Sequence, residues 1–297
     1  MNPRMKQWIL LVLLTLSPAL TMAKPIERPI ERTVEGNIER IVALSPHAVE
    51  MLFAIGAGDK IVATTEYADY PEQALSIPRI GGYHGIQLDR VLELEPDLIV
   101  VWKGGNQPGD IEQLKKLGFT IYHSEPESLE QIADEISELG DMLGHQEQAK
   151  EAATAFLERL AGLRNAYAQQ PPIKVFYQLW SNPLMSISKE SWIHQMIHSC
   201  GGVNVMADAS TAYPQVSLEQ VLLTDAEVIV RPEDHGTSKA TAMIWDKWQE
   251  LPAVKNKQIY SIDGDLLHRF SPRALDGMHR MCEVLMTARA ATAKRAN

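Results

Sequence analysis

Six aromatic residues stand where a protein could hold a ligand between two walls. Each lies at or just after the end of a short apolar run that is typical of a strand: Tyr67, Tyr70, Tyr83, Trp102, Trp180 and Tyr213. Aromatic rings supply a large contact area with few torsions to order, which suits a ligand-binding cleft. Any one of these rings could instead belong to the core. As a group they favour a cleft.

Histidines offer a second possible chemistry, since neutral imidazole is a common metal ligand. His47, His84 and His268 fall in predicted loops or helix starts on the same side as the aromatic residues. No two of them share a local metal-binding motif. We therefore expect solvated or hydrogen-bonding histidines, with no metal site and no cofactor.

Signatures of enzymes are absent from the chain. It contains no GxGxxG, GxxxxGK[ST], HExxH or GxSxG motif, and no pairing of nucleophile and base can be recognised, so we expect a binding protein and keep a cleft enzyme only as an alternative. The 38 acidic residues exceed the 28 basic ones, and the formal net charge is -10. This balance argues against a nucleic-acid partner, because binding to phosphates depends on Lys and Arg.

The elements that would position these residues alternate between strand and helix. Predicted strands cover residues 40–44, 61–63, 98–101, 119–122 and 175–177. Helices are predicted from Ser45-Pro46 to Gly56, over 110–117, and over 127–167 with a break near Gly144. This alternation predicts an α/β fold with mainly parallel sheets flanked by helices.

A match at an offset of 130 residues indicates an internal repeat. Residues 88–100 and 218–230 share leucine, valine, isoleucine and acidic positions in step, and Tyr83 and Tyr213 stand five residues before each window. Coincidence is the alternative, since any short helix before a buried strand has this pattern. A true repeat predicts two similar lobes with one tyrosine on each wall of a cleft between them.

Two terminal features complete the predicted organisation. Residues 1–23 combine Arg4 and Lys6, an apolar run and a small-residue site near Ala23, which predicts a cleaved secretory signal peptide; a membrane anchor is disfavoured because Ser17-Pro18 interrupts the run. Two domains are expected for this length. The predicted division is a polar tail (24–37), an N-terminal lobe (38–145), a linker helix (146–171) and a C-terminal lobe (172–297).

Cys200 and Cys282 are the two cysteines of the chain. In an exported protein they favour one disulfide bond, with two buried free thiols as the alternative. Neither belongs to a CxxC pair, and the spacings of zinc sites are absent.

Eight segments resemble the periplasmic substrate-binding proteins of ABC importers. They are residues 41–46, 67–71, 92–100, 102–106, 188–191, 200–202, 213–216 and 269–273. The strand following Glu95-Pro96-Asp97 is shared with binders of haem and siderophores. Residues 102–106 and 213–216 together are similar to binders of cobalamin, and the resemblance spans essentially the whole mature chain.

This resemblance implies a periplasmic monomer with two lobes, one long connecting helix and little hinge motion, which delivers cobalamin to a membrane permease. It places the ligand between Pro46, Tyr67, Tyr83 and Trp102 on one wall and Tyr213, Asp265 and Arg269 on the other. Tyrosines replace the tryptophans that cobalamin binders often carry at positions 83 and 213, and Leu179 stands where an aromatic residue can occur. Asp265 and Arg269 could instead pair with each other. A binder of haem or of a ferric siderophore is the alternative, with Tyr67, Tyr83 or His84 on the iron.

Asp89 and Glu219 occupy matching positions in the two repeated windows. Each is expected in the first turn of a helix, where the helix dipole favours a carboxylate, and Ser217 with Gln220 forms a capping-box pattern. Helix capping is one interpretation of the pair. The resemblance implies another, in which the two acids dock onto arginines of the permease.

Overall fold

The computed structural model describes residues 37–233 and 245–296. The predicted signal peptide and nearly all of the polar tail lie outside these residues. None of the helices described is long and apolar enough to cross a membrane.

The N-terminal lobe is built on a parallel four-stranded sheet with the order β2-β1-β5-β6. Its strands are β1 (Ile41–Ala43), β2 (Ile61–Thr64), β5 (Leu98–Trp102) and β6 (Ile121–Ser124), and a hairpin is formed by β3 (Gly81–Gly82) and β4 (Gly85–Ile86). Its helices are α1 (Pro46–Ala54), α2 (Leu88–Leu94), α3 (Pro108–Lys116) and α4 (Leu129–Leu143), with short 3-10 helices at Gly58–Lys60 and Glu72–Ser76.

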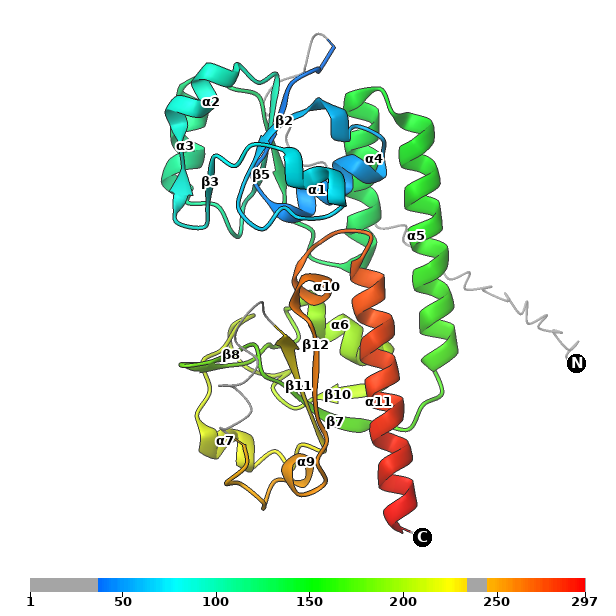
Figure 1. Ribbon diagram of the computed structural model, residues 1–297. Helices are drawn as coiled ribbons and strands as arrows, with labels where there is room; N and C mark the ends of the chain where they lie inside the picture. Colours follow the sequence, from blue (N-terminus) through cyan, green and yellow to red (C-terminus); the bar gives the residue numbers. More distant parts are fainter. Residues whose placement is uncertain (1–36, 234–244, 297) are drawn as a thin grey trace, which may run out of the picture. The chain divides into compact units, whose positions relative to one another are not determined.

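The C-terminal lobe repeats this plan with the strand order β10-β7-β11-β12. Its strands are β7 (Ile173–Tyr177), β10 (Gly202–Asn204), β11 (Val228–Glu233) and β12 (Ile259–Asp263), with a hairpin of β8 (Trp180–Ser181) and β9 (Leu184–Met185). Its helices are α6 (Trp192–Ser199), α7 (Leu218–Leu222), α9 (Pro252–Lys255), α10 (Gly264–His268) and α11 (Ala274–Ala296). The long helix α5 (Gln146–Tyr167) follows the N-terminal sheet and precedes the C-terminal sheet in the sequence. It packs beside α4 (Figure 1).

The internal repeat is confirmed by the pairing of the central strands. Val100 of β5 pairs with Ala43 of β1, and Val230 of β11, at the same 130-residue offset, pairs with Tyr177 of β7. The two windows therefore occupy equivalent helix-strand units, α2-β5 and α7-β11. The predicted mainly parallel sheets are also present.

Both faces of each sheet are buried. In β5, Leu98 and Val100 point to one side and Ile99 and Val101 to the other, and all four are fully buried. Helices α2 and α3 cover one face of the N-terminal sheet and α1 and α4 the other (Figure 1). A strand buried on both faces explains why these runs are continuously apolar. The face of the N-terminal sheet that α1 and α4 cover and one face of the C-terminal sheet belong to one shared core. This core also contains Phe156 and Leu160 of α5.

Local capping signals in the sequence are confirmed. The Ser45 hydroxyl accepts a hydrogen bond from the amide of Ala48 at 3.3 Å, and Pro46 is the first residue of α1. Gly144 ends α4 with φ 75°, a left-handed conformation that glycine adopts without a steric penalty. Ser217 and Gln220 form the predicted capping box of α7.

Several predicted element starts are wrong by two residues, among them those of α4, at Leu129 rather than at residue 127, and of β7, at Ile173 rather than at residue 175. Helix α3 begins at Pro108 rather than at residue 110, because proline fits the first helical position. The next strand begins at Ile121 rather than at Phe119. The amide of Phe119 donates to the carbonyl of Leu114 of α3, so this residue lies in the turn that follows the helix.

The Cys200–Cys282 bridge is present, with the two Cα atoms 4.7 Å apart. It joins the C-terminal end of α6 to the middle of α11, and both cysteines are fully buried. The alternative of two free thiols is therefore wrong.

Candidate functional site

A cavity of about 900 Å³ is lined by residues of both lobes. The N-terminal lobe contributes Trp102, Gly104, Glu125, Pro126 and Glu127. The C-terminal lobe contributes Leu179, Lys189, Glu190, Trp192, Ile193, Gln195, Ala212, Tyr213, His268 and Phe270. This volume lies at the upper end of the range of roughly 300–1,000 Å³ that is usual for small-molecule sites. The cavity is therefore our candidate ligand site.

Trp102 ends β5 and forms the aromatic part of the N-terminal wall. The side-chain oxygen of Asn106 accepts a hydrogen bond from the Trp102 amide at 2.7 Å, and its Nδ2 donates to the carbonyl of Leu44 at 2.8 Å. The indole lies against Gly105, where a Cβ atom would overlap the ring. Residues 102–106 thus hold the ring at the carboxyl end of the sheet, where ligands bind in open α/β folds.

Phe270 joins the aromatic residues of the two walls. Its ring centroid lies 4.7 Å from that of Trp192 and 6.3 Å from that of Trp102. Such spacings are typical of interacting aromatic pairs. The result is a continuous aromatic surface whose members come from β5, α6 and the segment between α10 and α11.

His47 lies beneath this surface and is almost fully buried. Its ring contacts Trp102 and Phe270 edge-on, at centroid distances of 5.5 and 5.6 Å. Its Nε2 lies 3.0 Å from the Ser124 hydroxyl, which donates to Glu135 at 2.7 Å. Burial, together with the nearby charge of Arg269, lowers the pKa of His47 to about 3. The imidazole is therefore neutral at any physiological pH and acts as a packing and hydrogen-bonding group.

A pH dependence of stability follows from this lowered pKa. Between pH 6.5 and about 3 the unfolded chain binds a proton at His47 before the folded protein does, so the free energy of unfolding falls as the pH falls. The slope from this one group approaches about 1.4 kcal/mol per pH unit. Replacing His47 with Gln should reduce the measured slope by about that amount in urea unfolding between pH 6 and 4. An unchanged slope would show that His47 is protonated normally in the folded state.

Two of the predicted ligand residues, Trp102 and Tyr213, line the cavity. Pro46 is half-buried at the start of α1 and does not line it, and neither do Tyr67 and Tyr83, whose side chains are both 64% exposed. Tyr83 sits at the tip of the β3-β4 hairpin, with its ring 3.6 Å from that of His84. Tyr70 and Trp180 are also outside the lining residues. A position just after a strand therefore does not by itself place a ring in the cavity: Tyr83 and Trp180 lie on the two hairpins, Tyr67 and Tyr70 lie in the loop after β2, and all four rings are exposed.

Asp265 and Arg269 form the structural salt bridge that was the alternative to ligand contact. Arg269 Nη2 lies 2.7 Å from the Asp265 carboxylate, and neither residue lines the cavity. Arg269 also reaches the carboxylates of Glu50 and Asp69. Burial opposes its charge, but the hydrogen bonds to Asp69 and Glu50 outweigh this and raise the pKa of Arg269. The guanidinium is held by protein carboxylates.

The remaining histidines differ in their surroundings. His268 lines the cavity, and its Nε2 lies 2.9 Å from the Tyr177 hydroxyl, whereas His84 is exposed. Within residues 37–233 and 245–296 there is no group of three or more His, Cys, Asp or Glu side chains that could hold a metal ion.

Several cavity residues were not predicted from the sequence, above all Trp192, Phe270 and Gln195. The repeat carries a signal for one of them. Ser45 caps α1 directly after β1, and Ser191 caps α6, its equivalent in the second lobe. The residue after each serine, Pro46 or Trp192, therefore begins the corresponding helix.

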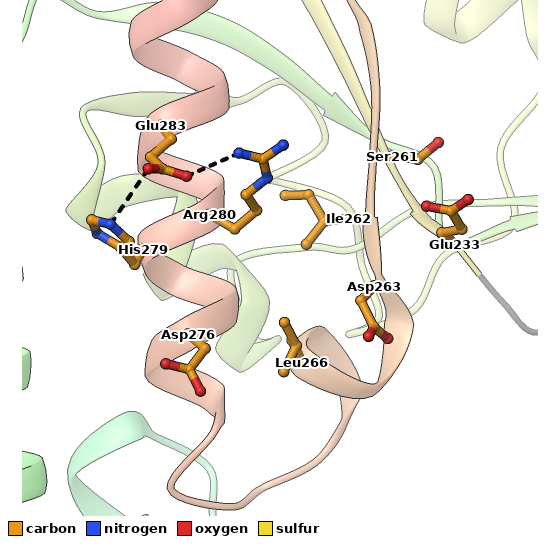
Figure 2. Close-up of a pocket in the computed structure, with 9 residues that line it drawn as sticks. All are labelled: Glu233, Ser261, Ile262, Asp263, Leu266, Asp276, His279, Arg280 and Glu283. Carbon is orange, nitrogen blue, oxygen red and sulfur yellow. Dashed lines mark hydrogen bonds and ion pairs between the residues drawn. The ribbon is translucent and has the colours of Figure 1, made fainter.

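A smaller pocket of about 390 Å³ lies within the C-terminal lobe, between β12, α10 and α11 (Figure 2). Three of its side chains bind one another: Glu283 pairs with Arg280 at 3.0 Å and with His279 at 3.5 Å. None of the predicted site residues lines it. It does not compete with the larger cavity as a ligand site.

The two acids of the repeat, Asp89 and Glu219, are exposed in the first turns of α2 and α7. Hydrogen bonds from its own backbone amide and from the Ser217 hydroxyl lower the pKa of Glu219. Both carboxylates are thus available at the surface, on equivalent helices of the two lobes.

The periplasmic binding protein family model matches residues 41–266. The chain belongs to the periplasmic binding protein family. One relative in the family, the vitamin B12-binding protein of Vibrio cholerae, is 42% identical over 251 residues, which cover 84% of this chain and 90% of that protein. The predicted family resemblance is therefore confirmed.

Solved structures of family members agree with the fold. The crystal structure of the vitamin B12-binding protein BtuF of Vibrio cholerae matches with a TM-score of 0.78 and 42% identity, covering 85% of this chain and 98% of that one. The heme-binding protein RhuT from Roseiflexus sp. RS-1 matches with a TM-score of 0.75 over 85% of this chain and 99% of its own, at 23% identity. At that identity the likeness shows the shared fold alone.

Proposed function

We propose that this chain is a periplasmic substrate-binding protein that captures cobalamin between its two lobes and delivers it to an inner-membrane ABC importer. The observation that carries the proposal is the aromatic cavity of about 900 Å³, with Trp102 on one wall and Tyr213 on the other. The 42% identity to a vitamin B12-binding protein supports the choice of ligand.

The chemistry of the cavity suits a corrinoid. The rim of the corrin ring carries neutral amides around an apolar body, so it can use both aromatic faces and polar groups. Trp102, Trp192, Tyr213 and Phe270 supply apolar area, while Lys189 and Glu190 supply a donor and an acceptor at the edge. Direct contacts by Trp102 and Tyr213 are part of this proposal. Contacts by Pro46, Tyr67, Tyr83, Asp265 and Arg269 stay predictions.

The other parts of the proposal follow from transport. We infer that residues 1–23 direct export and are removed near Ala23, that the protein acts as a monomer without a catalytic role, and that Asp89 and Glu219 meet the permease. One exposed charge at the same place on each lobe fixes the orientation in which the protein meets the permease more than it increases the affinity for the permease.

Calorimetric titration of the purified protein with cyanocobalamin and, separately, with haemin and a ferric siderophore tests the ligand. We expect saturable binding of one cobalamin per chain and no covalent change in it. Saturable binding of haem or siderophore without heat from cobalamin would overturn the assignment in favour of the iron-ligand alternative.

Substitution of Trp102 locates the site in the same titration. Trp102→Ala removes a cavity-lining indole and should weaken cobalamin binding by about 1–3 kcal/mol. Trp180→Ala removes an exposed indole outside the cavity and is the matched control, with affinity expected to stay at the wild-type value. Equal cobalamin affinities of both variants and wild type would show that cobalamin does not bind in this cavity.

A further inference from the structure

The segment that carries Phe270 is held across the two lobes by one side chain of the N-terminal lobe. Arg269 is in an extended conformation, with φ -102° and ψ 123°. Side chains alternate in direction along extended backbone. Phe270 accordingly faces the cavity, whereas its neighbours Arg269 and Ser271 both bind Glu50 of α1.

Glu50 accepts four hydrogen bonds from this segment, and its side chain is 1% exposed. Arg269 Nη1 donates to Oε1 at 2.9 Å, and the Ser271 hydroxyl donates to Oε2 at 2.6 Å. Arg273 donates to both carboxylate oxygens of Glu50, from Nε to Oε2 at 2.9 Å and from Nη2 to Oε1 at 2.6 Å. Charge-assisted bonds of this kind fix geometry tightly, and removal of the buried anion leaves its two arginines without their shared partner.

The same arginines also hold the loop at residues 67–70. Arg269 donates to the Asp69 carboxylate at 2.8 Å and to the Tyr67 carbonyl at 3.0 Å. The guanidinium of Arg273 lies over the ring of Tyr70, 3.9 Å from its centroid. One anion therefore organises groups from α1, from the 67–70 loop and from the segment after α10.

We propose that Glu50 is a positioning residue for the ligand cavity: through Arg269, Ser271 and Arg273 it holds Phe270 against Trp102 and Trp192. Glu50 does not line the cavity, so it acts on the ligand through these rings. The proposal rests on the cobalamin-binding function for its effect on affinity. Its structural part, the placement of the rings, stands apart from the identity of the ligand.

Glu50→Gln tests the proposal with little change of shape. The glutamine side chain keeps one oxygen acceptor but carries no charge. Arg269 and Arg273 therefore lose the carboxylate to which both of them donate. We expect cobalamin affinity to fall by at least about tenfold. Arg273→Lys, which keeps the charge but cannot bind both oxygens as a fork, should cause a smaller loss of about threefold. If Glu50→Gln does not fold, the affinity of Arg273→Lys tests the proposal in its place.

Asp276→Asn is the matched control. Asp276 forms an ion pair with Arg159 of α5 at 2.6 Å and does not line the larger cavity. Its loss should leave affinity within about twofold of wild type.

A spectroscopic readout separates this inference from the ligand assignment. In ligand-free protein labelled with 5-fluorotryptophan, the fluorine resonances of Trp102 and Trp192 should shift or broaden in Glu50→Gln, while that of Trp245, packed on Phe176 in the C-terminal core, stays in place. Lower stability with unmoved Trp102 and Trp192 resonances and wild-type affinity would overturn the proposal. If wild-type protein does not bind cobalamin, the proposed function fails, and the resonances still decide the role of Glu50.

Discussion

Replacing both Asp89 and Glu219 with Lys is expected to abolish cobalamin uptake by cells while the affinity of the protein for cobalamin stays unchanged. Both carboxylates are exposed, they lie on the equivalent helices α2 and α7, and neither lines the cavity. If the two acids dock onto arginines of the permease, as we propose, their reversal to Lys replaces attraction with repulsion at both contacts. Uptake of labelled cobalamin in a strain that lacks the wild-type protein measures the first effect, and calorimetry the second.

The control is a double reversal with the same change in charge at another surface, Glu151→Lys with Glu158→Lys on α5, where both residues are exposed. This variant should support normal uptake. Helix capping by Asp89 and Glu219 predicts instead a small loss of stability and no effect on transport. Normal uptake by the Asp89 and Glu219 variant would therefore leave capping as their role.

Removal of the Cys200–Cys282 bridge should cause the largest loss of stability among these changes. The bridge closes a loop with a sequence separation of 82, for which the chain-entropy model gives about 4 kcal/mol. Urea unfolding of the Cys200→Ser, Cys282→Ser double variant measures this loss. Wild-type protein treated with reductant should match the variant.

Cobalamin affinity should survive the loss of the bridge, because neither cysteine lines the cavity. Mass spectrometry of unreduced exported protein should find Cys200 and Cys282 in one linked peptide pair. Two free thiols in that protein, or equal stability of variant and wild type, would contradict the prediction.

Local signals explain why much of the fold could be predicted. Ser45 and Gly144 mark a helix start and a helix end through contacts with residues three or four positions away, and apolar runs such as residues 98–101 mark strands that are buried on both faces. The repeat then predicts the second lobe from the first, down to the pairing of Val230 with Tyr177.

The cavity was harder to predict because its walls depend on distant contacts. Trp102 is the last residue of β5, directly after the apolar run that predicts this strand, so the sequence identifies it. Phe270 comes after the helix α10, and its segment is held by the bond between Arg269 and Glu50, 219 positions apart. Nothing in the pattern around Glu50 separates it from a solvated acid on a helix. The sequence predicts Tyr67 on the ligand wall, but it does not reveal the φ of 65° at this residue or the hydrogen bond from Arg269 to its carbonyl.

The core shared by the two lobes has a consequence for how the chain acquires its structure. Phe156 and Leu160 of α5 pack in the same cluster as Val100 of the first sheet and Val230 of the second. Either half alone would expose that apolar face to water, which disfavours independent folding. The two halves, although built to one plan, therefore form a single cooperative unit, and a partly synthesised chain that ends before α6 cannot complete its core.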